Sequence, residues 1–198
     1  MPSTRWCVAC DDELAMGPDA PRVVTPRIDP QVPVFALGRY AGARRRAIVG
    51  VKDRGRADLL TPLSRSLALG MHRLLLWGLL DVPLVVVPAP TRGWSARQRG
   101  GDPVTRIASL ATAGHPGIEV VRALRMKPWA RDSAGLNSAA RERNIAGRVL
   151  LTRRCPPPGG EVLLVDDIVT TGATARESVR VLQAAGTRVS AVLALAAA

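Results

Sequence analysis

The sequence predicts an α/β protein with a mainly parallel, doubly wound sheet. Short apolar runs begin near residues 84, 120, 149, 162 and 189, and helical repeats separate several of them. Runs without polar alternation are typical of strands buried on both faces. The run 162–165 also stops at two adjacent carboxylates, which marks the carboxyl end of a buried strand because acid is costly to bury. The 198 residues allow one main domain, over 32–198, and a small N-terminal segment, over 1–31.

The first 80 residues are expected to form a connector, one or two strands and two helices. Prolines crowd residues 17–33 and indicate an extended connector, with a short strand at 22–25. The run 32–37 predicts a strand. A helix follows from 40 to about 51, with Ile48 and Val51 inside and its arginines outside. After a basic turn, leucines at a three-four spacing predict a buried helix over 57–80.

The rest of the chain is expected to alternate strands with helices. Apolar runs and helical repeats predict, in order, a strand at 84–87, a helix at 103–113, a strand at 120–124, a helix at 136–144, a strand at 148–152, a strand at 162–165, a helix at 175–185 and a strand at 188–195. The alanine tail after the last strand is expected to fray.

Composition limits the partners and the location. Apolar residues make up 47% and aromatic residues 3%, so the core is mostly Leu, Val and Ala. The net charge of +12 suits a polyanionic ligand or nucleic acid, although a coding preference for arginine produces the same excess. The first 14 residues lack the apolar core of a signal peptide, and Arg73 and Asp81 close the run 74–80 far short of a membrane span. We expect a cytoplasmic protein.

The stretch 161–174 carries the clearest chemistry. Asp166 and Asp167 follow the buried strand, and a small hydroxyl-rich turn over 170–174 precedes a helix. Backbone N–H groups and hydroxyls converge in such a turn, and the amino end of the helix adds partial positive charge, so the turn predicts a phosphate seat. Carboxylates upstream accept hydrogen bonds from vicinal hydroxyls or lie near a divalent cation. Together these features describe a sugar phosphate with free hydroxyls.

Two other protein classes share a buried strand that ends in acid. Receiver domains need about a hundred residues beyond this point, and the remainder here is short. P-loop NTPases require Gly-x-x-x-x-Gly-Lys-Ser/Thr, but the two lysines, Lys52 and Lys127, stand outside any such motif. The sugar-phosphate interpretation is therefore preferred.

Cationic loops follow two other predicted strands. The loop after 84–87 carries Pro90, Thr91, Arg92 and Arg99, and its place after a parallel strand predicts a second anion seat, although a solvated basic face has the same composition. The segment 125–133 is polar and broken by proline. It is expected to be mobile and to close over phosphates with Arg125 or Lys127.

The stretch 162–174 resembles the phosphoribosyl pyrophosphate (PRPP) signature of type I phosphoribosyltransferases. The resemblance implies their fold, with the two acids binding the ribose 2′- and 3′-hydroxyls and the turn holding the 5′-phosphate. It implies that PRPP contacts Asp166, Asp167, Val169, Thr170, Thr171, Gly172, Ala173, Thr174, Pro90, Thr91, Arg92 and Arg99. Mg²⁺ would bind through PRPP near Asp166 and Asp167, and the catalytic set would be Asp166, Asp167, Arg125 and Lys127.

Further spacings resemble the ComF branch, whose members are associated with competence. They are Tyr40-x-Gly42-x-x-Arg45 with Ile48 and Lys52, Pro88-x-Pro90 with Arg97-x-Arg99-Gly100, and Leu136 with Arg141 and Asn144. Gly101 and Ser133 stand where an aromatic residue and a glutamine are usual. These departures leave the nucleobase contacts undetermined.

Cys7 and Cys10 form half of a zinc-ribbon ligand set. ComF-like proteins often carry all four ligands, but no second pair or histidine follows here before the core begins. Cys155, His72 or His115 would complete a site only by chance geometry. We expect a degenerate knuckle, and zinc at the two cysteines stays an open alternative.

Two functions follow from this pattern. The first is an enzyme that transfers phosphoribosyl from PRPP to an unknown nucleobase-like acceptor, with Mg²⁺-assisted pyrophosphate release, in DNA uptake (competence) or nucleotide salvage. The second is a non-catalytic, PRPP-sensing competence factor whose arginines at 39–56 and 97–106 contact single-stranded DNA, although few aromatic residues accompany them. A second copy of the chain, forming a homodimer, is a further candidate partner.

Overall fold

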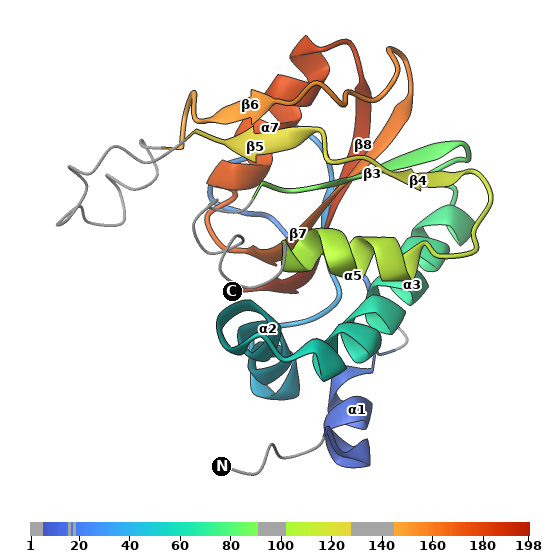
Figure 1. Cartoon of the computed structure of the whole chain (residues 1–198), viewed down its shortest axis with the longest axis vertical. Coiled ribbons are helices and arrows are strands. Elements are labelled where there is room, and N and C mark those ends of the chain that lie inside the picture. Colours follow the sequence, from blue (N-terminus) through green and yellow to red (C-terminus); the bar gives the residue numbers. More distant parts are fainter. Residues whose placement is uncertain (1–5, 16, 18, 91–101, 128–144) are drawn as a thin grey trace, which may run out of the picture.

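A computed structural model of the chain describes residues 6–15, 17, 19–90, 102–127 and 145–198. The elements within these residues follow one another in a mixed α/β order (Figure 1). They are α1 (Val8–Leu14), β1 (Arg22–Val23), β2 (Val34–Ala36), α2 (Gly42–Arg54), a 3-10 turn η1 (Ala57–Leu59), α3 (Leu60–Leu76), β3 (Leu84–Pro88), α5 (Pro103–Ala111), β4 (Ile118–Val120), β5 (Leu124–Met126), β6 (Val149–Leu151), β7 (Glu161–Val169), α7 (Ala173–Ala184) and β8 (Arg188–Ala197).

The main sheet has six strands in the order β1-β2-β8-β7-β3-β4. Only the β1–β2 pair is antiparallel, and the four other pairs are parallel. β7 lies between β3 and β8, so the strand that carries the acid pair is held on both edges. The predicted α/β class with a mainly parallel sheet is confirmed.

Helices cover both faces of this sheet. α2, α3 and α5 pack on one face, while α7 and the small β5–β6 sheet pack on the other (Figure 1). Each face of the sheet packs against its own hydrophobic core, so both sides of a central strand are apolar. In β7, Leu163 and Val165 enter the α2/α3/α5 core, and Val162 and Leu164 enter the α7 core.

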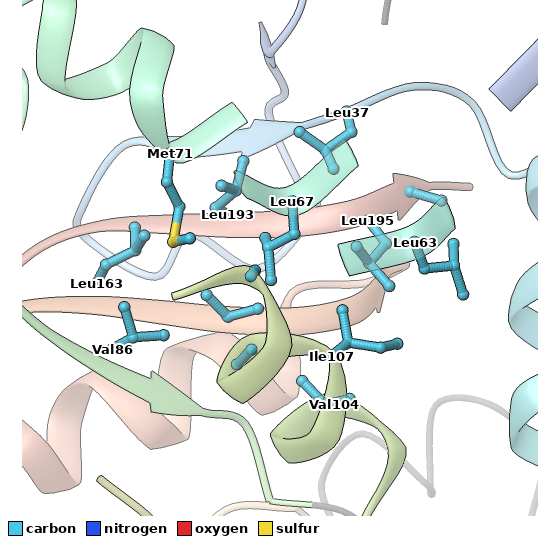
Figure 2. Close-up of a cluster of buried hydrophobic side chains, with 14 of the residues drawn as sticks. Leu37, Leu63, Leu67, Met71, Val86, Val104, Ile107, Leu163, Leu193 and Leu195 are labelled. Atoms are coloured by element: carbon cyan, nitrogen blue, oxygen red, sulfur yellow. The ribbon is translucent and has the colours of Figure 1, made fainter. Parts of the chain in front are cut away.

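The larger core forms where α3 and α5 meet the sheet. Figure 2 shows Leu67 and Met71 of α3 and Ile107 of α5 gathered against Leu163 and Leu193 of the strands. Leu63, Leu67 and Leu163 are each 0% exposed, which makes this contact the main apolar support of the central strand.

The central strands are longer than the apolar runs alone predict. β7 continues through both acids to Val169, because β8 keeps pairing with it as far as Ala197. The tail expected to fray is therefore part of a strand, and Ala196 is 0% exposed. The backbone hydrogen bonds of the ladder extend the strand past the point where its side chains turn polar.

The single strand predicted at 120–124 is wrong, because residues 121–123 separate β4 of the main sheet from β5. The strand predicted at 148–152 corresponds to β6, which lies outside the main sheet. The chain leaves β4 at Val120, and β5 then pairs antiparallel with β6 in a separate two-stranded sheet. Leu124 and Val149 bury one side of this small sheet against the α7 core, whereas Arg125 is exposed. Local periodicity locates strands but does not say which partner they pair with.

One arginine of α2 lies inside rather than outside. Arg44 is 5% exposed and donates hydrogen bonds to the carbonyl oxygens of Leu14, at 2.6 Å, and Leu195, at 3.3 Å. Burial lowers the pKa of this guanidinium. Arg44 thereby ties α1 and β8 to α2. Within the described residues, no helix has the length and apolar character of a membrane span.

Replacing Leu163 by alanine is expected to cost about 2 to 5 kcal/mol of unfolding free energy, because it opens a cavity between β7 and the α3/α5 layer. Urea unfolding followed by circular dichroism measures the loss. Leu110→Ala on α5 is the matched control, since Leu110 is 50% exposed. Equal losses for the two variants would contradict the packing described.

Candidate functional site

The turn between β7 and α7 has the backbone form of an anion seat. Gly172 takes the left-handed conformation, with φ 86°, and precedes the first residue of α7. The Ala173 N–H points back to the Thr171 hydroxyl, at 3.4 Å, and the first turn of α7 carries no acidic residue. The first N–H groups of a helix lack intrahelical acceptors and favour an anion. Thr170 is exposed just before the turn, and Thr174 is half-buried in the first turn of α7.

The connector before β2 packs directly against this turn. Ile28 N–H donates to the Thr171 carbonyl at 2.8 Å, and the Arg176 side chain donates to the Asp29 carbonyl at 3.4 Å. A Cβ atom on Gly172 would lie 2.3 Å from the Ile28 oxygen and 2.8 Å from Pro26 Cβ. Glycine is therefore required here by its backbone angle and by the close approach of the connector.

The two acids lie just upstream, inside β7. Asp166 accepts a hydrogen bond from the Asp167 N–H at 2.8 Å, and Asp167 accepts one from the Ile168 N–H at 2.8 Å. The other oxygen of Asp167, Oδ2, lies 2.5 Å from Lys52 Nζ in the last turn of α2. The site thus contains a fixed cation beside the acid pair.

Burial and mutual charge set the protonation of this group. Burial of the Asp166 carboxyl, together with the charge of Asp167, raises the pKa of Asp166 well above its usual range. Burial works against the charged form of Lys52, but Asp167 and Asp166 outweigh it, so the pKa of Lys52 is raised. A donor or cation that reaches Asp166 therefore relieves an unfavourable negative charge.

The end of β3 lies at the same edge of the sheet. Pro88 pairs with Val165, and the Ala89 N–H donates to the Val165 carbonyl at 2.7 Å. This pairing brings Pro90 to the edge where Asp166 begins the polar part of β7, as expected for carboxyl ends of parallel strands. Thr91, Arg92 and Arg99 lie outside the described residues.

Arg125 and Lys127 come from the opposite layer. Arg125 is exposed on β5, opposite Leu150 of β6, and the Lys127 N–H donates to the Arg148 carbonyl at 2.8 Å. The segment expected to be mobile therefore begins as a paired strand. Among the described residues, no hydrogen bond or ion pair joins these two cations to Asp166 or Asp167, so their catalytic role stays a prediction.

Much of the basic charge predicted for a nucleic-acid face is used within the protein. Besides the buried Arg44, Arg46 pairs with Glu13 at 3.0 Å, and Arg56 pairs with Asp58. Arg45 lies 5.8 Å from the ring centroid of Tyr40. These contacts occupy part of the stretch 39–56, and most of the stretch 97–106 lies outside the described residues. Binding of single-stranded DNA therefore stays a prediction.

Of the two N-terminal cysteines, Cys10 contacts α2. Cys7 immediately precedes α1, hydrogen bonding with Cys10 lowers its pKa, and Cys10 Sγ accepts a long contact from Arg46 at 3.8 Å. In the part of the chain that the structure describes, no group of three or more His, Cys, Asp or Glu side chains is arranged to hold a metal ion. Zinc at Cys7 and Cys10 stays untested.

Lys52 is the site residue whose contact with the acid pair the sequence did not predict. Its sequence context indicates only a basic turn and a ComF-like spacing. A signal was available, because lysine occurs only twice among the 28 Lys and Arg residues. A lone lysine in an arginine-rich chain indicates a position where a compact ammonium is preferred over a guanidinium.

Gly172→Ala is expected to destabilise the protein more than Gly114→Ala. Both glycines have positive φ, but a Cβ at Gly114 meets nothing within 4 Å. The control should lose about 1 to 2 kcal/mol from backbone strain, and Gly172→Ala about 1 to 3 kcal/mol more, because the connector must move. Chemical unfolding measures both losses; equal values would mean that the connector does not press on the turn.

Asp166→Asn is expected to stabilise the fold at neutral and alkaline pH. A native pKa above the unfolded value means that ionisation weakens the fold, so wild-type stability falls as pH rises through the native pKa of Asp166. The gain should be large at about pH 8 and vanish near pH 4, around the unfolded pKa of aspartate. Unfolding across this range measures it, with exposed Asp81→Asn as control. A loss of stability at high pH would contradict the assignment.

Comparison with known proteins finds one similarity in sequence. No family model matches the chain. An orotate phosphoribosyltransferase from Bordetella petrii is 31% identical over 93 residues, which are 47% of this chain and 36% of that protein. The chain thus aligns with little more than a third of the length of this relative.

Two solved structures are similar in outline. A hypoxanthine phosphoribosyltransferase from Staphylococcus aureus has a TM-score of 0.40 and 14% identity, with 68% of this chain and 61% of that chain covered. An adenine phosphoribosyltransferase from Rhodothermus marinus has a TM-score of 0.39 and 18% identity, with coverage of 92% and 83%. About half of this chain is therefore similar in sequence to part of a phosphoribosyltransferase, and the ComF branch stays an interpretation.

Proposed function

We propose that the protein binds PRPP at the carboxyl edge of β7 and transfers its phosphoribosyl group to a nucleobase-like acceptor. The observation that carries the proposal is that an acid pair in β7 is followed closely by the turn that starts α7. Asp166 and Asp167 lie near the carboxyl end of β7, which closes at Val169, and the start of α7 follows directly after Gly172. A ribose 5-phosphate presents the matching pair of groups, a diol and a phosphate.

The 5′-phosphate would bind at the turn. Backbone N–H groups at the start of α7 and the hydroxyls of Thr170, Thr171 and Thr174 supply donors, and no carboxylate stands in the first helical turn. The connector covers the far side of the turn through Ile28. The connector thus holds the backbone of the turn in place behind the proposed phosphate seat.

The acid pair would bind the sugar hydroxyls and lie near the cation that PRPP carries. Carboxylate oxygens are the ligands that Mg²⁺ prefers, so the donor chemistry of Asp166 and Asp167 fits this ion. When bound, Mg²⁺ would neutralise charge on the diphosphate. Pro90, Thr91, Arg92 and Arg99, on the loop after β3, are proposed to hold the pyrophosphate.

Transfer requires little proton chemistry from the protein. A nitrogen of the acceptor forms a bond to the ribose C1 carbon while the bond from C1 to the diphosphate oxygen breaks, and pyrophosphate leaves with the electron pair. Cations and backbone amides stabilise that leaving charge. Arg125 and Lys127 are proposed to contribute from the β5 side.

The biological setting is proposed from the resemblance. Similarity to ComF-like spacings supports a role in DNA uptake, and similarity to an orotate phosphoribosyltransferase supports one in nucleotide metabolism. A PRPP-binding protein without catalysis is the alternative.

Asp167→Asn is expected to weaken PRPP binding about ten- to a hundredfold, because it removes a charged hydrogen-bond acceptor worth 1.5 to 3 kcal/mol. Calorimetry with and without Mg²⁺ measures the dissociation constant, and the circular dichroism spectrum should stay unchanged. Asp81→Asn makes the same chemical change at the opposite end of the sheet and should bind like wild type. An unchanged constant for Asp167→Asn would count against the site.

Catalysis is tested by pyrophosphate release from PRPP and Mg²⁺ with a panel of nucleobases. At least one base is expected to give release that Asp167→Asn abolishes. If no base gives pyrophosphate release although the protein binds PRPP, the non-catalytic alternative is favoured.

A further inference from the structure

Lys52 presents a cation to the acid pair from a different element. It lies in the last turn of α2, where basic residues are favoured by the negative end of the helix dipole. Its Nζ atom is 2.5 Å from Asp167 Oδ2, across 115 positions of sequence. The pair therefore depends on the tertiary packing of α2 on the sheet and not on a local turn.

One side of the pair is lined by apolar side chains. Lys52 and Asp167 line a small pocket whose other walls include Ile48, Val51, Val104 and Leu195. The Asp167 side chain is 15% exposed and that of Lys52 is 44% exposed. Asp167 is thus largely shielded from water while its cation enters from the solvent side, so the Coulomb attraction between them is less screened than at the surface.

We propose that Lys52 is the resident counter-ion of Asp167, which keeps free divalent cations off the acid pair until a diphosphate ligand delivers one. Lys52 is a positioning residue in this role, since it acts on the carboxylate that meets the ligand. The inference rests on the proposed function. A free Mg²⁺ or Mn²⁺ ion must displace the ammonium of Lys52 to use Asp167, whereas an ion that arrives with PRPP brings further ligand contacts to offset that displacement.

The geometry explains why this residue is lysine. An ammonium is a compact point charge on a flexible side chain. When Lys52 moves away, it releases a single oxygen atom of Asp167, Oδ2. A guanidinium would bind a carboxylate through two donors and be harder to displace. Lys52 is thereby suited to a contact that is made and broken in each binding cycle.

The test is a titration with Mn²⁺ in the absence of any nucleotide or sugar phosphate. Electron paramagnetic resonance of the free ion measures how much Mn²⁺ is bound. Wild type is expected to bind Mn²⁺ weakly. Lys52→Met, whose side chain suits the apolar pocket, is expected to bind it at least about tenfold more tightly, because a neighbouring positive charge has been removed. Arg45→Met removes one charge from the exposed side of the same helix and should behave like wild type. Lys52→Gln also removes the charge and serves as the second variant if methionine disturbs α2.

Two further measurements make the result specific. The double variant Lys52→Met/Asp167→Asn should lose the gained Mn²⁺ affinity, which locates the ion at Asp167. Mn²⁺ binding by wild type as tight as that of both neutral Lys52 variants would overturn the inference. PRPP titration of wild type is independent of this comparison: its failure would remove the proposed function, whereas unchanged Mn²⁺ binding with normal PRPP binding would remove only the role of Lys52.

Discussion

The placement of β7 between β3 and β8 is the constraint on which the rest of the structure depends. Parallel ladders on both edges hold its backbone through Val169, well past the end of its apolar run. Two carboxylates are consequently carried on a strand that cannot shift register without moving both buried faces. The phosphate turn begins where this strand ends, so its distance from the acids is fixed by the sheet.

The site concentrates unfavourable features that the fold compensates elsewhere. Burial and the neighbouring Asp167 raise the pKa of Asp166, and the connector approaches Gly172 so closely that a Cβ atom would not fit there. Buried charge of this kind is expected at binding sites. Leucines of α3 and the strands supply the opposing stability, since their side chains are fully buried in the α2/α3/α5 core.

The fold class and the acid-turn motif were predictable because both are written in local sequence. The apolar runs that begin at residues 84 and 162 lack polar residues at alternate positions, which indicates strands buried on both faces. Gly172 immediately precedes α7 and has the left-handed backbone conformation that glycine favours. Contacts distant in sequence were not predictable. Periodicity could not say that β5 pairs with β6, that Arg44 points inward to Leu195, or that Lys52 meets Asp167, because each depends on how separate elements pack.

The most direct test of the account compares ribose 5-phosphate with 2-deoxyribose 5-phosphate by calorimetric titration of the wild-type protein. Both ligands carry the phosphate, and only the first offers the second hydroxyl to the acids. The account predicts that ribose 5-phosphate binds at least about tenfold more tightly, because a hydrogen bond to a carboxylate is lost in the deoxy sugar. Equal affinities, or no binding of either, would contradict the claim that one strand end presents both a diol-binding acid and a phosphate seat.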